Sequence, residues 1–162
     1  MLVVSLVILL VILVLATAGV RLTASEEKMA GHSYDRTLAF QAAEGALREI
    51  EGRVALTRPT AAGACADVPG DGFSVLTCPP PAGNDKPRWA DASFTQWGTA
   101  SPIGIDQLSI TPTYVVEYLG ASFPCSADPT DPPACKRYRI TARANAGPER
   151  AAVTVQSIYA TD

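Results

Sequence analysis

Four cysteines carry the clearest chemistry in this sequence, because thiols either bind metal ions or oxidise in pairs to disulfides. Cys65, Cys78, Cys125 and Cys135 show no C-x-x-C spacing, and the chain offers one histidine, His32, as a further ligand. Zinc sites use cysteine and histidine at closer spacing, so we expect no metal and no other cofactor. Four such cysteines instead predict two disulfides formed in an oxidising compartment.

The four cysteines can form two disulfides in three different pairings, and the sequence does not distinguish among them. We favour the local pairs, Cys65 with Cys78 and Cys125 with Cys135, because each closes a short loop that contains proline or glycine. Closing a loop of about 15 residues contributes about 3 kcal/mol by restricting the unfolded chain. Buried free thiols are the alternative.

Other reactive groups are sparse. The chain has no P-loop, no H-E-x-x-H, no G-x-S-x-G and no glycine-rich dinucleotide turn. His32 and Ser33 are neighbours in a helical stretch, so they point about 100° apart and do not form a nucleophile and base pair. We predict that the protein is not an enzyme.

Two pairs of loop aspartates supply oxygen atoms of the kind that Ca²⁺ prefers. Asp67 with Asp71, and Asp128 with Asp131, lack the spacing of an EF-hand and its closing glutamate. A calcium site is therefore not expected. The net charge of −3 is small and its basic residues are scattered, so nucleic acid is not an expected partner.

The elements that carry these groups begin with an uncharged run of twenty residues. In a helix this run spans about 30 Å, the thickness of a bilayer core, so we predict a transmembrane segment over 1–22. The first charge, Arg21, follows the run, whereas membrane anchors usually carry basic residues on their cytoplasmic flank. We therefore expect that a basic leader has been removed before Met1. A signal peptide cleaved after 16–18 is the alternative.

The next stretch, 23–56, has the pattern of an amphipathic helix. Apolar residues recur at spacings of 3 and 4, which places on one packing face Phe40, Ala43, Leu47, Ile50 and Val54. Because the first proline is Pro59, one helix over about 1–56 is predicted. Gly31 marks either a bend or a tolerated helical glycine.

The remaining residues, 57–162, are rich in proline and glycine and suit one globular head with short strands. Strands are predicted over 73–77, 113–119, 136–144 and 151–159, the last two forming a hairpin around the turn residues 145–150. The predicted fold class is α+β, a long helix packed on a small antiparallel sheet.

Two sets of head residues invite a binding role. Alternation along 136–144 places Arg137, Arg139 and Arg143 on one face, where they would contact an acidic partner or remain solvated. The loops contain Trp89, Phe94 and Trp97, which would stack on a ligand or, as we favour, cap the core.

The stem carries a resemblance to a known family. Residues 26–31 (EEKMAG) and 35–48 (DRTLAFQAAEGALR) resemble the stem of PilX-type minor pilins of type IV pili. The terminal stretch 138–159, with VTVQSIY at 153–159, is similar to the last hairpin of those proteins. We find no such likeness over 57–113.

The resemblance implies a type IV pilin-like fold and a structural function. A prepilin peptidase would cut the leader, and Met1 would become the N-methylated first residue. The subunit would reside in the inner membrane with its head in the periplasm. The inner-membrane assembly machinery would then draw it into the pilus, where its N-terminal helix contacts other minor pilins and the major pilin. Such proteins prime pilus assembly and sit at or near the tip.

Position 5 departs from the general pilin pattern. Most pilins have glutamate there, thought to meet the amine of the subunit ahead, and this chain has Ser5. An unpaired buried charge costs several kcal/mol, so a subunit that lacks this carboxylate suits a place with nothing ahead of it. The alternative is that Ser5 simply hydrogen-bonds to its own helix.

Other functions stay open at this point. The unmatched loops would present a ligand surface if the protein is a tip adhesin. A type II secretion pseudopilin at the tip also lacks the position-5 glutamate, but it usually carries a large helical insertion for which this head has no room. A plain membrane-anchored periplasmic protein would keep its basic leader.

Overall fold

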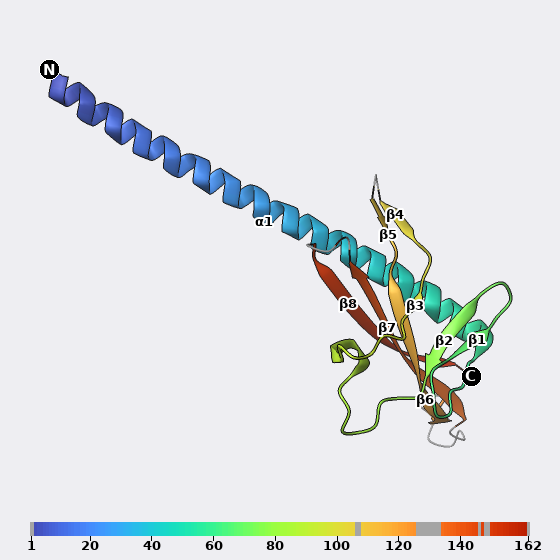
Figure 1. Cartoon of the computed structure of the whole chain (residues 1–162). Coiled ribbons are helices and arrows are strands. Elements are labelled where there is room, and N and C mark those ends of the chain that lie inside the picture. The colour runs from blue at the N-terminus through green and yellow to red at the C-terminus, as the bar shows by residue number, and fades with distance from the viewer. Residues whose placement is uncertain (1, 106–107, 126–133, 146, 148–149, 162) are drawn as a thin grey trace. The chain divides into compact units, whose positions relative to one another are not determined.

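A computed structural model describes residues 2–105, 108–125, 134–145, 147 and 150–161 (Figure 1). The chain forms two compact units, 1–35 and 36–162, and each is considered by itself. The helix α1 (Leu2–Thr57) contributes residues to both units. The other elements are β1 (Ala66–Pro69), β2 (Ser74–Cys78), the 3-10 helix η1 (Arg88–Ala90), β3 (Gly98–Thr99), β4 (Ile103–Ile105), β5 (Leu108–Ile110), β6 (Thr113–Phe123), β7 (Cys135–Asn145) and β8 (Ala152–Thr161).

The first unit is helical from Leu2 onward, and the large apolar side chains from Leu2 to Leu15 are exposed. Three of its hydroxyls bond to the backbone of their own helix: Ser5 Oγ donates to the Leu2 carbonyl at 2.8 Å, Thr17 Oγ1 to the Val14 carbonyl at 2.9 Å, and Thr23 Oγ1 to the Gly19 carbonyl at 3.2 Å. Gly31 is helical, which favours the tolerated glycine over the bend. Among the described residues, no helix combines the length and apolar character needed to cross a membrane. Met1 lies outside the described residues.

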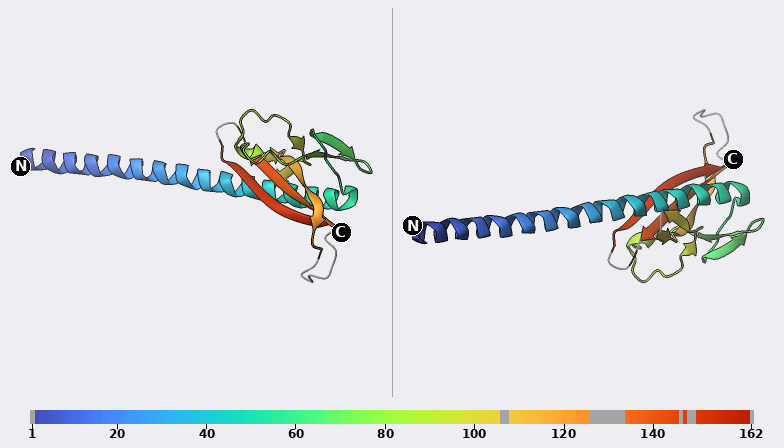
Figure 2. Two further views of the ribbon diagram at one scale, coloured as in Figure 1. Left: turned by 90° about the horizontal axis from the view of Figure 1, so that it is seen from below. Right: turned by 90° about the horizontal axis from the view of Figure 1, so that it is seen from above.

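The helical part of the second unit packs on the sheet through a stripe of apolar side chains, half of them alanines. Figure 2 shows this part of α1 running along the sheet. The buried members of this stripe are Leu38, Ala39, Ala42, Ala43, Ala46, Leu47, Ile50 and Val54. Phe40 was predicted to belong to it, and that prediction is wrong, since 49% of Phe40 is exposed. Phe40 lies about 100° around the axis from the buried Ala39, at the border of the stripe. The alanines, rather than the aromatic ring, set how closely the helix approaches the sheet.

The helix ends by a change of backbone conformation before a proline. Arg58 takes a φ of 43°, and its amide donates to the Val54 carbonyl at 2.8 Å, as in left-handed helix caps. Lys136 Nζ on β7 donates to the Arg58 carbonyl at 2.9 Å. Pro59 then prevents the helix from continuing.

The sheet has six strands, with the order β1-β2-β6-β7-β8 and β3 paired to β6. β4 and β5 form a separate hairpin. The prediction of an α+β fold is confirmed, but the sheet is not wholly antiparallel, because β2 and β6 pair in parallel over two residue pairs. Parallel neighbours need a crossover connection, and residues 79–112 provide it. We call these residues the crossover segment.

The four predicted strands appear as β2, β6, β7 and β8, and the last two form the predicted hairpin. Turn residues 146, 148 and 149 lie outside the described residues. The sequence missed β1, β3, β4 and β5, which have two to four residues each. Strands this short show too few alternations to stand out from loops.

The main core lies between the helix and one face of the sheet. Ile50 and Val54 pack there with Tyr114 and Tyr138, which are 2% and 0% exposed. Burial raises the pKa of Tyr138 to about 12, although the neighbouring Thr161 hydroxyl opposes the shift. Burial likewise raises the pKa of Tyr114, whose hydroxyl donates to the Ser74 carbonyl at 3.2 Å.

Glycine at position 98 allows β3 to lie against this core. A Cβ atom at Gly98 would stand 2.7 Å from the Tyr114 ring, closer than real contacts allow. Any larger residue would therefore displace the tyrosine or the short strand.

Two disulfides close loops of the head, in the local pairing favoured from the sequence. Cys65 joins Cys78 with their Cα atoms 4.0 Å apart, and Cys125 joins Cys135 at 5.1 Å. Each bond fastens the end of a strand to a neighbouring loop, and no described cysteine is free.

Candidate functional site

A buried carboxylate stands at the centre of the sheet face that the helix does not cover. Glu117 on β6 is 3% exposed and lies opposite Arg139 of β7 in the strand register. Its Oε2 accepts from Arg139 Nη1 at 3.2 Å, and its Oε1 lies 3.0 Å from Arg88 Nε. A carboxylate between two guanidinium groups is compensated for its loss of water.

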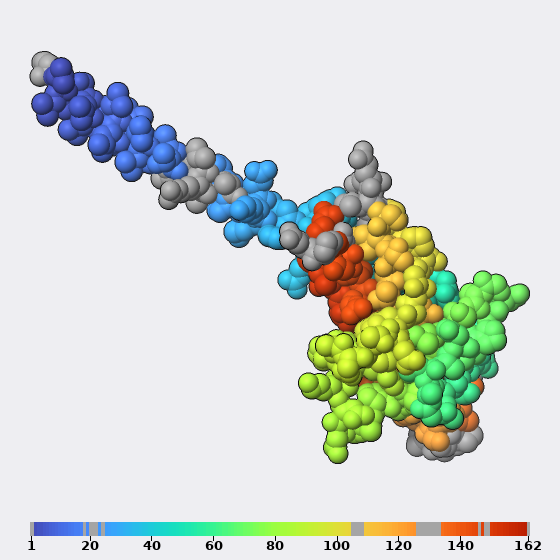
Figure 3. All heavy atoms as spheres, in the orientation of Figure 1, coloured from blue at the N-terminus to red at the C-terminus, as the bar shows by residue number. Residues whose placement is uncertain are grey.

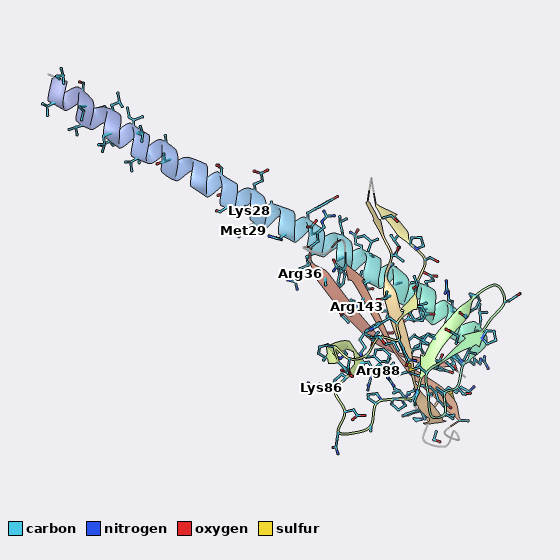
Figure 4. The ribbon with its side chains drawn as sticks, in the orientation of Figure 1. Lys28, Met29, Arg36, Lys86, Arg88 and Arg143 are labelled. Atoms are coloured by element: carbon cyan, nitrogen blue, oxygen red, sulfur yellow. A yellow bond between two sulfur atoms is a disulfide. The ribbon has the colours of Figure 1, made fainter. Side chains whose placement is uncertain are left out.

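Arg88 brings the crossover segment onto this face. It begins η1, its Nη2 donates to the Pro79 carbonyl at 2.6 Å, and its guanidinium lies 4.8 Å from the Phe94 ring centre. Figure 4 labels Arg88 beside Lys86 on this segment. Of these three contacts of Arg88, those with Pro79 and Phe94 lie within the crossover segment, and the one with Glu117 joins the segment to the sheet.

The predicted row of arginines exists, but its members are engaged within the head. Arg143 lies 4.2 Å over the Trp97 ring, and Arg137 lies 4.8 Å over the ring of Phe123. Arg139 holds the ion pair with Glu117, with 35% of its side chain exposed. Cation and ring contacts of this type contribute about 0.5–1 kcal/mol each at exposed sites. The contact of this row with a partner stays a prediction.

The two tryptophans have different surroundings. Trp97 is half-buried, packs edge-on against Phe94 at 5.7 Å, and donates from Nε1 to the Phe94 carbonyl at 3.2 Å. Trp89, on η1, is 56% exposed. It lines a cavity of about 300 Å³ together with Thr154 and Gln156 of β8. In Figure 3 the yellow-green crossover segment adjoins the red surface of the last strands. Trp97 packs against Arg143 and Phe94, and Trp89 is exposed beside the cavity, so a role of these rings in capping the core stays a prediction.

Polar contacts join the helix to a part of the crossover segment that follows Trp97 in the sequence. Glu49 pairs with Arg53 one turn later, as its i,i+4 spacing predicts. Its carboxylate also accepts from the amide of Ser101 at 3.1 Å and from the Ser101 hydroxyl at 2.7 Å. On the neighbouring side, Glu51 accepts from the hydroxyl of Ser157 at 2.6 Å.

Among the described residues, no group of three acidic, histidine or cysteine side chains is placed to hold a metal ion. Asp67 and Asp71 are exposed, and Asp128 and Asp131 lie outside the described residues. Asp91 has a different role. The hydroxyl and amide of Ser93 donate to it, and these bonds lower the pKa of Asp91.

Comparison with protein families matches residues 1–48 to PilX N-terminal and residues 58–161 to Type IV pilus assembly protein PilX C-term. The chain belongs to the PilX family. Comparison with curated proteins and with solved structures gave no significant match. The PilX assignment confirms the resemblance of the stem and the last hairpin, and the second match also covers the middle of the head, where the sequence alone showed no likeness.

Membership makes the protein a type IV pilus component that is associated with the pilus or the membrane and interacts within the pilus assembly system. The family is one of pilus assembly proteins, and the expectation that this member is not an enzyme stays a prediction.

Sequence reasoning missed Glu117 and Arg88. A signal for Glu117 was present, because it is the one charged residue in the strand run 113–119 and shares its face with Thr113 and Val115. A buried position for an acid predicts a basic partner on the next strand. No local pattern identifies Arg88, which reaches this site from a loop 29 positions earlier in the chain.

Proposed function

We propose that this PilX-family protein is a minor pilin that primes type IV pilus assembly and sits at or next to the pilus tip. The observation that carries the proposal is the serine at position 5, where most pilins have a glutamate. Its hydroxyl donates to the Leu2 carbonyl of its own helix, the bond that the alternative to a tip role predicted, so the proposal rests on the missing carboxylate at position 5 and not on this bond. A neutral hydroxyl engaged in this way offers nothing that neutralises the amine of a neighbouring subunit.

The cost of that difference depends on position in the pilus. A subunit inside the pilus would face the amine of the subunit ahead in an apolar environment, where an unpaired charge costs several kcal/mol. A leading subunit has no such neighbour. The absence of a carboxylate at Ser5 is therefore least costly at the leading end.

The exposed apolar residues from Leu2 to Leu15 support a subunit that packs through this part of the helix. A contiguous apolar surface of this kind marks an interaction with a partner or a membrane. We propose that 1–22 lies in the inner membrane before assembly and contacts other pilin helices afterwards. In this scheme 23–56 is the stem and 57–162 the head, which faces the periplasm and then the cell surface.

The test is the position of Ser5→Glu subunits in assembled pili, with Ser5→Ala as the matched control. We expect Ser5→Glu to shift the protein from the tip into the shaft, because the new carboxylate pairs with the amine of a subunit ahead. Tip labelling of full-length protein in cells that make the complete pilus system measures this shift. Ser5→Ala should stay at the tip.

An unchanged position and an unchanged amount of Ser5→Glu protein would contradict the tip proposal. Cross-linking from the N-terminal helix to co-expressed pilins separately tests the role as a pilin. A set of partners without any pilin would contradict that role.

A further inference from the structure

The two edges of the main sheet differ in how they are protected against pairing with another strand. β1 forms one edge, has four residues, and includes a charged Asp67 and a proline, Pro69. β8 forms the other edge and has ten residues without a charge or a proline. Protein edges are usually shortened, charged, bulged or interrupted by proline, because unpaired backbone groups are a template for another chain. β1 has three of these features, and β8 has none of them.

The outer edge of β8 pairs with no other strand in the part of the chain that the structure describes. Among the described strands β8 pairs only with β7, through ten successive residue pairs without a bulge. Its side chains on the face away from the helix are all exposed, and Ile158 among them is 57% exposed. Backbone donors and acceptors on the outer side therefore face solvent beside an apolar side chain.

A cavity adjoins the same edge. Its walls are Trp89 of η1 and Thr154 and Gln156 of β8, and its volume of about 300 Å³ is enough for one large side chain. Gln156 is held in place, since its Nε2 donates to Thr141 Oγ1 at 2.8 Å. Trp89 is held through its neighbour Arg88 and the ion pair with Glu117. The cavity is thus formed by anchored groups.

We infer that the β8 edge accepts an extended segment of another pilus protein as an added strand. One apolar side chain of that segment would enter the cavity beside Trp89. Strand addition of this kind gains affinity from backbone hydrogen bonds and specificity from pockets for alternate side chains. The uncharged edge favours a segment that is uncharged where it pairs. This inference rests on the proposed function, which supplies neighbouring subunits.

A second copy of this chain is a poor occupant. Two β8 edges that pair around a closed two-fold axis run antiparallel, so the helical segments 36–57 of the two copies would run in opposite directions. Subunits of one pilus need their stems to run the same way. Pairing β8 with the β1 edge of a second copy is opposed by Asp67 and Pro69.

The experiment is photo-cross-linking of the full-length protein in cells that make the complete pilus system. The probe, p-benzoylphenylalanine, is placed at Ala160 on the β8 edge, at Ala66 on the β1 edge, and at Leu9 on the N-terminal helix. Ala160 is exposed and lies on β8 outside the cavity walls, so the probe leaves the cavity intact. Cross-linked peptides are identified by mass spectrometry. We expect Ala160 to cross-link to one segment of another pilus protein, with a yield about tenfold above that from Ala66.

Variants separate the edge from the cavity. Ile158→Lys places a charge on the edge, and Trp89→Ala removes a wall of the cavity. Each should lower the Ala160 yield about tenfold. Both side chains are exposed, so the fold should persist, and near-ultraviolet circular dichroism checks it. Ala66→Lys, the matched change on the β1 edge, should leave the yield unchanged.

Three results would overturn the inference: equal yields from Ala160 and Ala66, cross-links from Ala160 to a second copy, or no Ala160 product while Leu9 still reaches other pilins. The last result would leave the pilin role intact. Ala160 products without any from Leu9 would support the edge site and contradict the pilin role.

Discussion

The two faces of the main sheet are covered by different means. The helix covers one face with small apolar side chains such as Ala42 and Ala46 and with larger ones such as Ile50. The crossover segment covers the β6 and β7 part of the other face with an ion pair and aromatic rings, centred on Glu117 and Arg88. The stability of the first face depends on how closely its apolar side chains pack, and the stability of the second depends on specific charged and aromatic partners.

This difference has an energetic consequence. A tightly packed apolar face loses stability in proportion to the volume removed from it. A buried charge network loses most when one partner is deleted and the other stays behind uncompensated. The two faces should therefore respond differently to single substitutions, although both belong to one head.

The largest effect is expected at Glu117. Glu117→Ala leaves the guanidinium of Arg88 buried without its acid, so we expect a loss of about 3–5 kcal/mol in the free energy of unfolding. Denaturant unfolding of the full chain in detergent, followed by tryptophan fluorescence, measures the loss. Asp67→Ala removes an exposed acid and serves as the control, with little change expected. A loss below about 1 kcal/mol for Glu117→Ala would contradict a central role for the charge network.

On the helix face, Ile50 and Phe40 provide a matched pair. Ile50→Ala removes a fully buried side chain, so a loss of about 3 kcal/mol is expected. Phe40→Ala should cost less than about 1 kcal/mol because the ring is half-exposed at the border of the stripe. The same unfolding assay compares them. Equal losses would mean that Phe40 packs against the sheet after all.

Alkaline pH should weaken the helix face. The pKa of Tyr138 is raised from 10.0 to about 12 in the folded state, so between these values the folded protein binds more protons than the unfolded chain. Its contribution is complete below pH 10 and is lost as the pH rises toward 12, a fall of roughly 2 kcal/mol. Unfolding curves across this range measure the fall, which Tyr138→Phe should reduce. Some dependence of the free energy of unfolding on pH should persist in Tyr138→Phe, because burial also raises the pKa of Tyr114. An identical fall in Tyr138→Phe would assign the dependence to other groups.

The smallest effect is expected at the rim of the charge network. Arg143→Ala removes the cation over Trp97 and should cost about 0.5–1 kcal/mol. A shift in the fluorescence of Trp97 should accompany the loss, because the guanidinium covers its ring. Arg137→Ala, which uncovers Phe123 instead, should not shift the emission. If emission is unchanged in both variants, Arg143 does not cover Trp97 in solution.

The helix face was largely predictable from the sequence because its signals are local. Spacings of 3 and 4 identify Ala43, Leu47, Ile50 and Val54, and all four are buried. Phe40 was misjudged because its size and hydrophobicity suggested burial, whereas its place about 100° around the helix axis from Ala39 leaves it at the border of the buried stripe. Alternation of side chains likewise located β6, β7 and β8.

The other face was not predictable in the same way. Contacts such as Arg88 with Glu117 join residues 29 apart in sequence through a segment without periodicity. The short strands β3, β4 and β5 owe their pairing to the surrounding fold rather than to their own alternation. The sequence correctly predicted that the arginines of β7 share one face of the sheet. It did not predict the partners Trp97 and Glu117, because tertiary structure brings them to Arg143 and Arg139.

The short reach of the two disulfides bears on how the head is made. Each bond joins cysteines separated by only 13 or 10 positions, so under the proposed export of the head both partners of a pair would reach the periplasm almost together. Cys65 and Cys78 would then meet an oxidant before Cys125 and Cys135 emerge. Oxidation in order of emergence would yield the native pairs without later exchange between distant thiols.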